Sequence, residues 1–433
     1  MLETLRNAWR LQDLRKKMIY TLMIIMVFRI GAAIPVPFLL PEALAESAIM
    51  AGGTLLSYFD MLTGGALAQG SLFALGISPY ITASIIMQLL QVAIPALERL
   101  AKEGEAGRKK IAKITRYATL ALSFMMASAF YVMNRNFNAV MYTWGFAGWF
   151  SMAVIIMSFT AGAMLIVWLG EAIDKRGVGN GISIILFAGI VSGAPNALMM
   201  LWRFLVLAGN PGYERYYVFV PLIVIIFFVL IGAIVLMSNS ERRIPIQYAK
   251  RVVGRKMYGG QSSFIPVKVM MSGVMPIIFA GALLSIPGMI RGFVNPDPEG
   301  WGHRILSWFD YTHFVYAALY LLLIIAFNYF YVSIQYNPIQ MANDLRKNNG
   351  AIPGIRPGKP TSDFIARVIG KITLVGALFI AMIAILPIII GAVMHLPIAL
   401  GGTSIIIVVG VALDTVRSLE SQMMMRHYKG FLE

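Results

Sequence analysis

The chain has 433 residues, of which 58% are hydrophobic and 13% are charged, and its mean hydropathy is +0.74. These values exclude a soluble globular protein and indicate a polytopic membrane protein. The net charge of +16 comes from 36 Lys and Arg against 20 Asp and Glu, but the cations lie between apolar segments, as in cytoplasmic loops. Because there is no cysteine, disulfides, thiolate nucleophiles and iron–sulfur clusters are excluded.

Apolar segments recur along the whole chain. Residues 1–17 are basic and amphipathic, which predicts a helix on the cytoplasmic interface and an uncleaved N-terminus. Apolar runs long enough to cross a bilayer follow at about 18–34, 77–94, 114–133, 149–169, 182–202, 216–237, 269–289, 312–332, 369–390 and 398–416. The sequence therefore predicts an all-α membrane protein with ten transmembrane helices and a short tail at 419–433.

The stretch from Gly53 to Leu90 differs from the other apolar segments. In its first part, Asp60 and several glycines lower the hydrophobicity, so this part would insert poorly into lipid. Residues 77–94, in contrast, are uncharged and would form a helix about 27 Å long. The break lies near Gly76 and Pro79, and non-helical backbone at membrane depth is tolerated only against protein or a water-filled cavity. We therefore expect a re-entrant half-helix that folds back into a cavity.

Loop charges test this expectation. If the stretch before residue 77 re-enters, 28 Lys and Arg residues fall on the side of the N-terminus and 5 fall on the other side. A full crossing would instead place the basic cluster at 95–113 and the two richest later loops outside. The positive-inside rule therefore favours ten spans with both termini in the cytoplasm.

Ten spans divide into two halves of five, at 18–209 and 210–418. An odd number of spans per half forces the halves into opposite orientations, as in inverted-repeat transport proteins. The Gly-Asn-Pro-Gly turn at 209–212 is the predicted hinge. Two long basic loops at about 238–268 and 333–368 both lie on the predicted cytoplasmic side, and their length predicts a docking platform.

Short motifs in a fixed order carry a resemblance to a known family. They include FRIGAAIPVP (28–37), FDMLTGGAL (59–67), FALGISPYITASIIMQLL (73–90), WLGEAIDKRGVGNGISIILFAGIV (168–191), ERRIPIQYAKR (241–251), PGIRPGKPT (353–361) and GGTSIIIVV (401–409). In these motifs the chain resembles the SecY/Sec61-alpha family, the channel subunits of the general protein translocase. The resemblance extends over roughly 400 residues and implies a central pore for unfolded polypeptides.

The resemblance implies a plug and a pore ring. The plug corresponds to about 54–72, although the residues alone also allow an ordinary re-entrant packing element. Its predicted residues are Leu55, Tyr58, Phe59, Asp60, Met61, Gly64 and Gly65. The predicted aliphatic ring, which would make no specific hydrogen bond to a passing chain and would exclude ions by dewetting, consists of Ile77, Ile81, Leu186, Ile278 and Ile407.

The resemblance also implies a lateral gate and a docking surface. The gate would lie between the second and seventh spans, although small and polar residues there are equally typical of ordinary helix packing. Its predicted residues are Ser84, Met87, Gln88, Ser272, Met275 and Pro276. Docking of a motor or of ribosomal RNA phosphates is predicted at Lys250, Arg251, Arg255, Lys256, Arg346 and Arg356.

Partners follow from the same resemblance. They are small SecE-like and SecG-like membrane subunits, the SecA motor ATPase, the ribosome, signal sequences and unfolded preproteins, with anionic lipids at the basic loops. The implied location is the bacterial inner membrane. Three charged residues in or near apolar segments, Arg29, Asp60 and Asp414, require partners that the sequence does not identify.

Enzyme motifs are missing from the sequence. There is no GxxxxGK[ST] loop, GVGNG at 177–181 lacks the strand context of a dinucleotide site, and the four histidines have no metal-ligand spacing. We therefore predict a channel subunit without catalytic residues, metals or cofactors. Two alternatives are an inverted-repeat secondary transporter of a small solute, with broken helices in both halves, and a structural scaffold, which has no use for a re-entrant segment.

Overall fold

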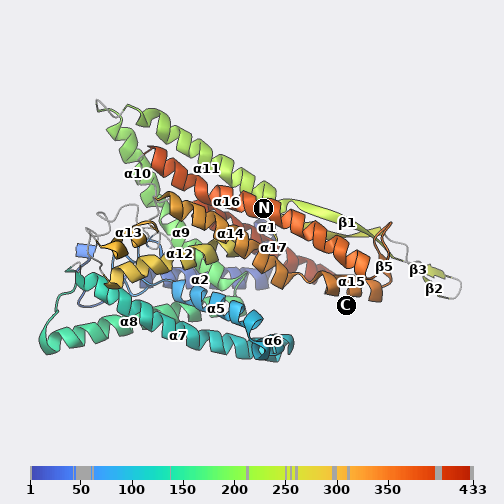
Figure 1. Cartoon of the computed structure of the whole chain (residues 1–433), viewed down its shortest axis with the longest axis horizontal. Helices are drawn as coiled ribbons and strands as arrows, with labels where there is room; N and C mark the ends of the chain where they lie inside the picture. The colour runs from blue at the N-terminus through green and yellow to red at the C-terminus, as the bar shows by residue number, and fades with distance from the viewer. Residues whose placement is uncertain are drawn as a thin grey trace.

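The computed structural model is an elongated bundle of long helices with strands at one end (Figure 1). It describes residues 2–41, 43–44, 60, 63–136, 138–210, 214–248, 251–253, 256–258, 262–294, 300–309, 313–394 and 402–429. The helices of the first half are α1 (Leu2–Arg10), α2 (Gln12–Ala32), α5 (Ser78–Ala93), α6 (Pro95–Lys102), α7 (Glu105–Asn136), α8 (Gly145–Arg176), α9 (Gly181–Ser192) and α10 (Ala194–Leu207). Those of the second half are α11 (Tyr216–Asn239), α12 (Met275–Val294), α13 (Trp301–Ser307), α14 (Phe314–Gln335), α15 (Pro338–Lys347), α16 (Lys359–Met394) and α17 (Gly402–Lys429).

Each predicted span coincides with helix in the structure. Among the described residues, six helices are long and apolar enough to cross a membrane, or seven if α5 and α6, bent by 101° at their junction, count as one span. The other predicted spans coincide with α2, α12 and α17. One span is divided into α9 and α10 at Gly193, and α12 begins at Met275, six residues later than predicted, after a turn at 269–274.

Exposed aromatic residues mark the two edges of the membrane zone. Trp149 and Trp168 on α8 are 70% and 64% exposed. Their separation of 19 residues corresponds to about 28 Å of helix, close to the thickness of a bilayer core. Because indole rings favour the interface between lipid and water, α8 is positioned to span the membrane with one tryptophan at each surface.

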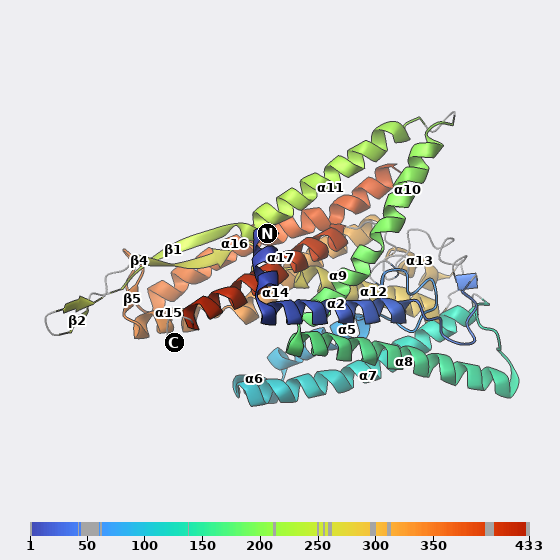
Figure 2. The same cartoon turned by 180° about the vertical axis from the view of Figure 1, so that it is seen from behind.

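The predicted N-terminal helix is divided at Leu11. The first piece, α1, packs against the last helix, where Ala8, Leu14 and Leu419 are buried in one small cluster. The Thr4 hydroxyl donates to Glu420 Oε1 at 3.1 Å. The N-terminal helix is therefore held against α17, instead of contacting only the interface, and Figure 2 shows the N-terminus beside α17.

The same pattern of helix neighbours recurs in both halves. In the first half α7 contacts α5 and α8, and α8 contacts α9; in the second half α14 contacts α12 and α16, and α16 contacts α17. The contacts of the first half therefore map onto those of the second half when each helix is matched with its counterpart: α5 with α12, α7 with α14, α8 with α16 and α9 with α17. This recurrence agrees with two pseudo-symmetric halves of five spans.

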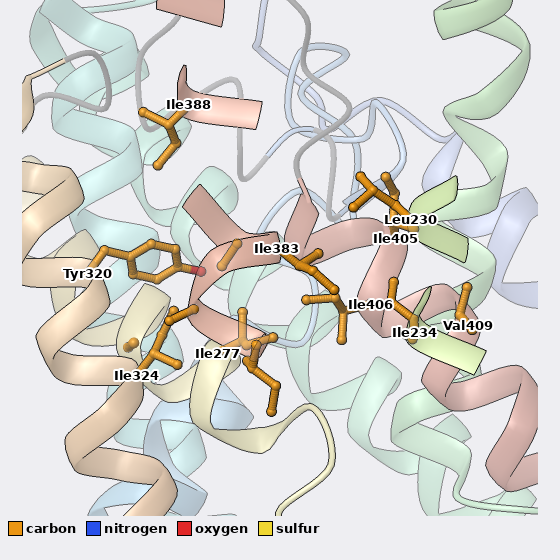
Figure 3. Close-up of a cluster of buried hydrophobic side chains, with 14 of the residues drawn as sticks. Leu230, Ile234, Ile277, Tyr320, Ile324, Ile383, Ile388, Ile405, Ile406 and Val409 are labelled. Atoms are coloured by element: carbon orange, nitrogen blue, oxygen red, sulfur yellow. The ribbon is translucent and has the colours of Figure 1, made fainter. Parts of the chain in front are cut away.

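Separate apolar cores stabilise the halves. One cluster in the first half includes Phe130, Ile155 and Phe159, with the two phenylalanine rings 5.1 Å apart in an edge-to-face arrangement. Figure 3 shows the cluster of the second half, in which side chains from α11, α12, α14, α16 and α17 converge. Ile277, Ile324 and Ile406 in this second cluster are each 1% exposed or less.

The two long basic loops contain strands, which were not predicted from the sequence. Strands β1 (Glu241–Tyr248) and β4 (Ser262–Lys268) pair antiparallel, with Glu241 opposite Lys268, and β5 (Gly350–Ala351) pairs with the far end of β1. Strands β2 (Arg251–Val253) and β3 (Lys256–Tyr258) form a second, smaller hairpin. Together with α6 and α15, these strands lie at one end of the bundle, which we call the basic end (Figure 1).

Residues 63–77, between α2 and α5, approach α8 closely. A Cβ atom on Gly162 would lie 1.9 Å from the Leu72 carbonyl oxygen, whereas a Cβ on Gly232 of α11 would meet nothing within 4 Å. Replacing Gly162 therefore forces the Leu72 backbone to move. The Leu72 amide donates to the Ile34 carbonyl at 2.9 Å, so the segment after α2 would be disturbed as well.

We expect Gly162→Ala to destabilise the protein by about 1–3 kcal/mol, the usual cost of overpacking. Gly232→Ala, a matched change in another apolar helix, should be neutral or stabilise by up to about 1 kcal/mol through helix propensity. Thermal unfolding of the two purified variants in detergent measures the difference. Equal melting temperatures would show that the contact between α8 and Leu72 does not constrain the fold.

Candidate functional site

All five residues of the predicted pore ring lie in one hydrophobic cluster between the halves. Ile77, Leu186 and Ile407 are buried members of this cluster, and Ile81 and Ile278 are partly buried residues packed against it. They come from the start and first turn of α5 and from α9, α12 and α17, so both halves contribute. The geometry brings together five aliphatic side chains, which can close a passage without binding what enters it.

The described part of the predicted plug contains turns where more helix was predicted. Asp60 and Thr63 are helical, but residues 64–77 form turns, so the helix does not continue to Leu72. The reason is the left-handed backbone of four glycines, with φ of 70° at Gly64 and 85° at Gly65 and similar values at positions 70 and 76. The predicted plug residues Leu55, Tyr58, Phe59 and Met61 lie outside the described residues.

Asp60 stabilises this turn through its own backbone neighbours. Its carboxylate Oδ1 accepts a hydrogen bond from the Ala68 amide at 2.8 Å, and its carbonyl accepts from the Gly65 amide at 2.9 Å. The Thr63 hydroxyl also donates to the Asp60 carbonyl, at 3.0 Å. The partners of Asp60 are thus within the same segment.

Arg29 forms a polar contact between α2 and α9, next to the turn. Its Nη1 donates to Ser192 Oγ at 2.8 Å, and the Ser192 hydroxyl donates to the Gly189 carbonyl at 2.6 Å. A Cβ atom on Gly64 would lie 2.2 Å from Ser192 Oγ and 2.9 Å from Arg29 Nη1. The backbone at residue 64 therefore lies directly on this contact, which we call the plug seat (Arg29, Gly64, Gly189 and Ser192).

The predicted gate helices are neighbours, but among the described residues no hydrogen bond of the predicted polar side chains joins the two helices. Helix α12 contacts both α5 and α7. On α5, Gln88 Nε2 donates to Ser84 Oγ at 3.5 Å within the same helix, and Met87 is buried. On the α12 side Pro276 is buried and Met275 is half-buried.

Ser272 points toward a different helix from the one predicted. Its hydroxyl donates to Asn328 Oδ1 on α14, and this contact is buried. Asn328 was not identified as a site residue from the sequence. The available signal was a lone amide in the apolar run IIAFNYFYV at 324–332, since such a group requires hydrogen-bond partners in a membrane.

The predicted docking residues lie at the basic end where the structure describes them. Arg346 on α15 and Arg356 are exposed, and Arg356 lies between two glycines with left-handed backbone, Gly354 (φ 80°) and Gly358 (φ 108°). Arg251 and Lys256 lie in β2 and β3. The other two predicted docking residues, Lys250 and Arg255, lie outside the described residues.

A separate apolar cluster joins the two basic loops into one unit. Ile246 and Val267 from the first loop, Ile352 from the second, and Ile365 from the start of α16 are all buried together. The loops therefore present their cations from a shared folded base.

Arg417 of α17 is the partner of Asp414. The two side chains are 3.7 Å apart, and Arg417 also donates a hydrogen bond to the Ser238 carbonyl at 2.8 Å.

Comparison with known proteins identifies the family. The family model for SecY matches residues 71–416. The protein translocase subunits SecY of Halalkalibacterium halodurans and Bacillus subtilis are each 44% identical, and that of Mycobacterium tuberculosis is 38% identical, with the full length of each chain covered in all three cases.

Solved structures give the same fold at lower identity. One described as "The structure of a protein conducting channel" has a TM-score of 0.64 and 20% identity, with 94% of this chain and 92% of that chain covered. Another, "Sec61 in the Canine ribosome-channel complex from the endoplasmic reticulum", has a TM-score of 0.61 and 18% identity, with the same coverage. The full-length relatives and the shared architecture lead to one conclusion: the chain belongs to the SecY family.

Proposed function

We propose that this chain is the pore subunit of a protein-conducting channel that passes unfolded polypeptides across a membrane and releases apolar segments sideways into lipid. By family it is a channel subunit and not an enzyme. The observation that carries the proposal is the convergence of Ile77, Ile81, Leu186, Ile278 and Ile407 in one apolar cluster between the halves.

An aliphatic ring suits this task for physical reasons. A translocating chain presents every kind of side chain and its backbone in turn, and aliphatic residues form no hydrogen bond that would retain one of them. At rest the same residues exclude water, and a dewetted constriction is a barrier to ions. The turn at 64–77 lies beside this ring, since Ala66 and Phe73 are buried in the same cluster. It is therefore positioned to act as the base of a plug.

The alternative of a small-solute transporter is less well supported. The curated relatives are named protein translocase subunits, and one solved neighbour is described by the words "The plug domain of the SecY protein". These names concern those proteins, but identity of 44% over the full chain favours the same activity here.

The proposed partners follow from the exposed surfaces. Exposed cations at the basic end, among them Arg346 and Arg356, favour docking of a SecA-type motor or of ribosomal RNA phosphates, with anionic lipid below them. Two solved neighbours are described as ribosome complexes. SecE-like and SecG-like subunits would cover part of the exposed apolar helix surface. We place the chain in a bacterial inner membrane with both termini in the cytoplasm.

Reconstitution tests the proposed function. Vesicles containing this chain, SecE-like and SecG-like subunits, a SecA-type motor, ATP and an unfolded precursor should accumulate protease-protected precursor. Vesicles without ATP or without this chain serve as controls. Uptake of a small solute without any protected precursor would favour the transporter instead.

Substitutions at the plug seat test the closed state. Gly64→Ala and Gly65→Ala both place a side chain on left-handed backbone, but only Gly64→Ala also collides with the Ser192 hydroxyl and the Gly189 carbonyl. If this collision costs about 1.4 kcal/mol, the unseated population and the resting ion conductance rise about tenfold relative to Gly65→Ala. Conductance in planar bilayers measures the difference. Equal conductance of the two variants would show that the contact at the plug seat does not keep the channel closed.

Charge reversal tests the docking surface. Arg356→Glu removes an exposed cation at the tip of the second basic loop, so motor affinity should fall about tenfold or more, the equivalent of one charge-assisted hydrogen bond. Arg367→Glu, the same charge change at an exposed position on α16, serves as the control. Binding of the motor to reconstituted channel measures both, and equal loss in the two variants would indicate only general electrostatic attraction.

A further inference from the structure

The segment that leads into gate helix α12 is an irregular turn at residues 269–274. It follows β4 directly, and its first amide, on Val269, donates to the Ser240 carbonyl at 3.0 Å. Near its end Gly273 has left-handed backbone, with φ of 59° and open space around the position of a Cβ atom. The orientation of α12 therefore depends on contacts that fix this turn.

One buried side chain, Asn328 of α14, hydrogen-bonds both the turn and helix α16. Its Oδ1 accepts a hydrogen bond from the Ser272 hydroxyl, and its Nδ2 donates to the Thr373 carbonyl of α16 at 3.3 Å. All three residues are 4% exposed or less. Because a buried amide that loses its partners is costly, this arrangement favours one position of the turn between α14 and α16.

Two glycines bring neighbouring helices close to the same turn. A Cβ atom on Gly376 of α16 would lie 2.4 Å from the Val269 carbonyl oxygen, and one on Gly410 of α17 would lie 2.9 Å from Val274 Cγ1. In addition, Met271 is buried in the apolar cluster of the basic loops. The turn is thus enclosed by α14, α16, α17 and the basic loops. Asn328 accepts the hydrogen bond from Ser272 of the turn and, through its other side-chain atom, links α14 to α16.

We propose that Asn328 is a positioning residue for the lateral gate: it holds the start of α12 through Ser272, so that α12 stays against α5 until the turn is released. Gly273 provides a flexible point between the held residue and the helix. This proposal rests on the proposed function only in assigning a role to the seam between α5 and α12. The hydrogen bonds and the helix contact are features of the fold itself.

A distance measurement between the two helices tests the proposal. The chain lacks cysteine, so spin labels can be attached to single cysteines introduced at Ile86 of α5 and Leu283 of α12, which are 39% and 41% exposed. The doubly labelled full chain is placed in lipid nanodiscs, and pulsed electron paramagnetic resonance gives the distribution of distances. Neither motor nor precursor is added, so the outcome does not depend on whether the chain transports proteins.

Asn328→Leu removes both hydrogen bonds and keeps the number and branching of the side-chain heavy atoms, and Ser272→Ala removes the donor alone. Each should shift or broaden the distribution toward longer distances by about 2 Å or more, the scale of helix shifts in switching proteins. The double variant should move no further than Asn328→Leu, because both changes break the same contact. Ser272→Ala also tests the proposal if Asn328→Leu does not fold.

Asn134→Leu is the matched control. Asn134 of α7 is also fully buried, but its side-chain nitrogen and oxygen have no hydrogen-bond partner among the described residues, so its replacement should leave the distribution unchanged. Unchanged distances in both Ser272→Ala and Asn328→Leu would overturn the proposal. An equal shift in Asn134→Leu would overturn it as well, because the effect would then reflect general loosening of the bundle.

Discussion

Backbone groups of a non-helical segment at membrane depth must find partners inside the protein, and this requirement determines much of the first half. The segment at 63–77 meets it by pairing with the residues after α2, through the Gly70 carbonyl and the Leu72 amide, and by folding around Asp60. Such pairing needs left-handed glycines and a helix without a side chain at Gly162. The apolar ring can then form where this segment turns into α5.

The second half meets the same requirement with a different solution. The turn before α12 occupies the position that corresponds, in the repeated packing, to the segment before α5. In the first half the carboxylate of Asp60 hydrogen-bonds the irregular segment, and in the second half a buried asparagine does so. In both places glycine allows a backbone approach that any side chain would prevent. Each helix of the predicted gate is thus preceded by an irregular segment held by one polar residue.

Much of the architecture was predictable from the sequence because membrane spans carry a strong signal. Long apolar runs located the helices, loop charges gave the predicted topology, and the resemblance selected Ile77, Leu186 and Ile407, which the structure brings together. Turns and strands were harder to predict from the sequence. The left-handed backbone of Gly64 lies against Ser192 and Gly189 of α9, which are more than 100 residues away in the sequence. The pairing of β1 with β4 joins two segments separated by residues without a clear strand pattern. Asn328 was overlooked because its partners lie 45 and 56 residues away.

The hairpin of β1 and β4 also has a mechanical consequence. A single residue, Ser240, separates α11 from β1, and β4 leads directly into the turn before α12, so both strands join their helices at the Ser240–Val269 hydrogen bond. Eight residues of strand extend about 26 Å from that bond. The hairpin is therefore a lever whose fulcrum lies near the start of α12, one of the two helices of the predicted gate. A force on its far end therefore acts as a torque on the turn at 269–274, and a large excursion at the tip becomes a small rotation of the backbone that leads into α12.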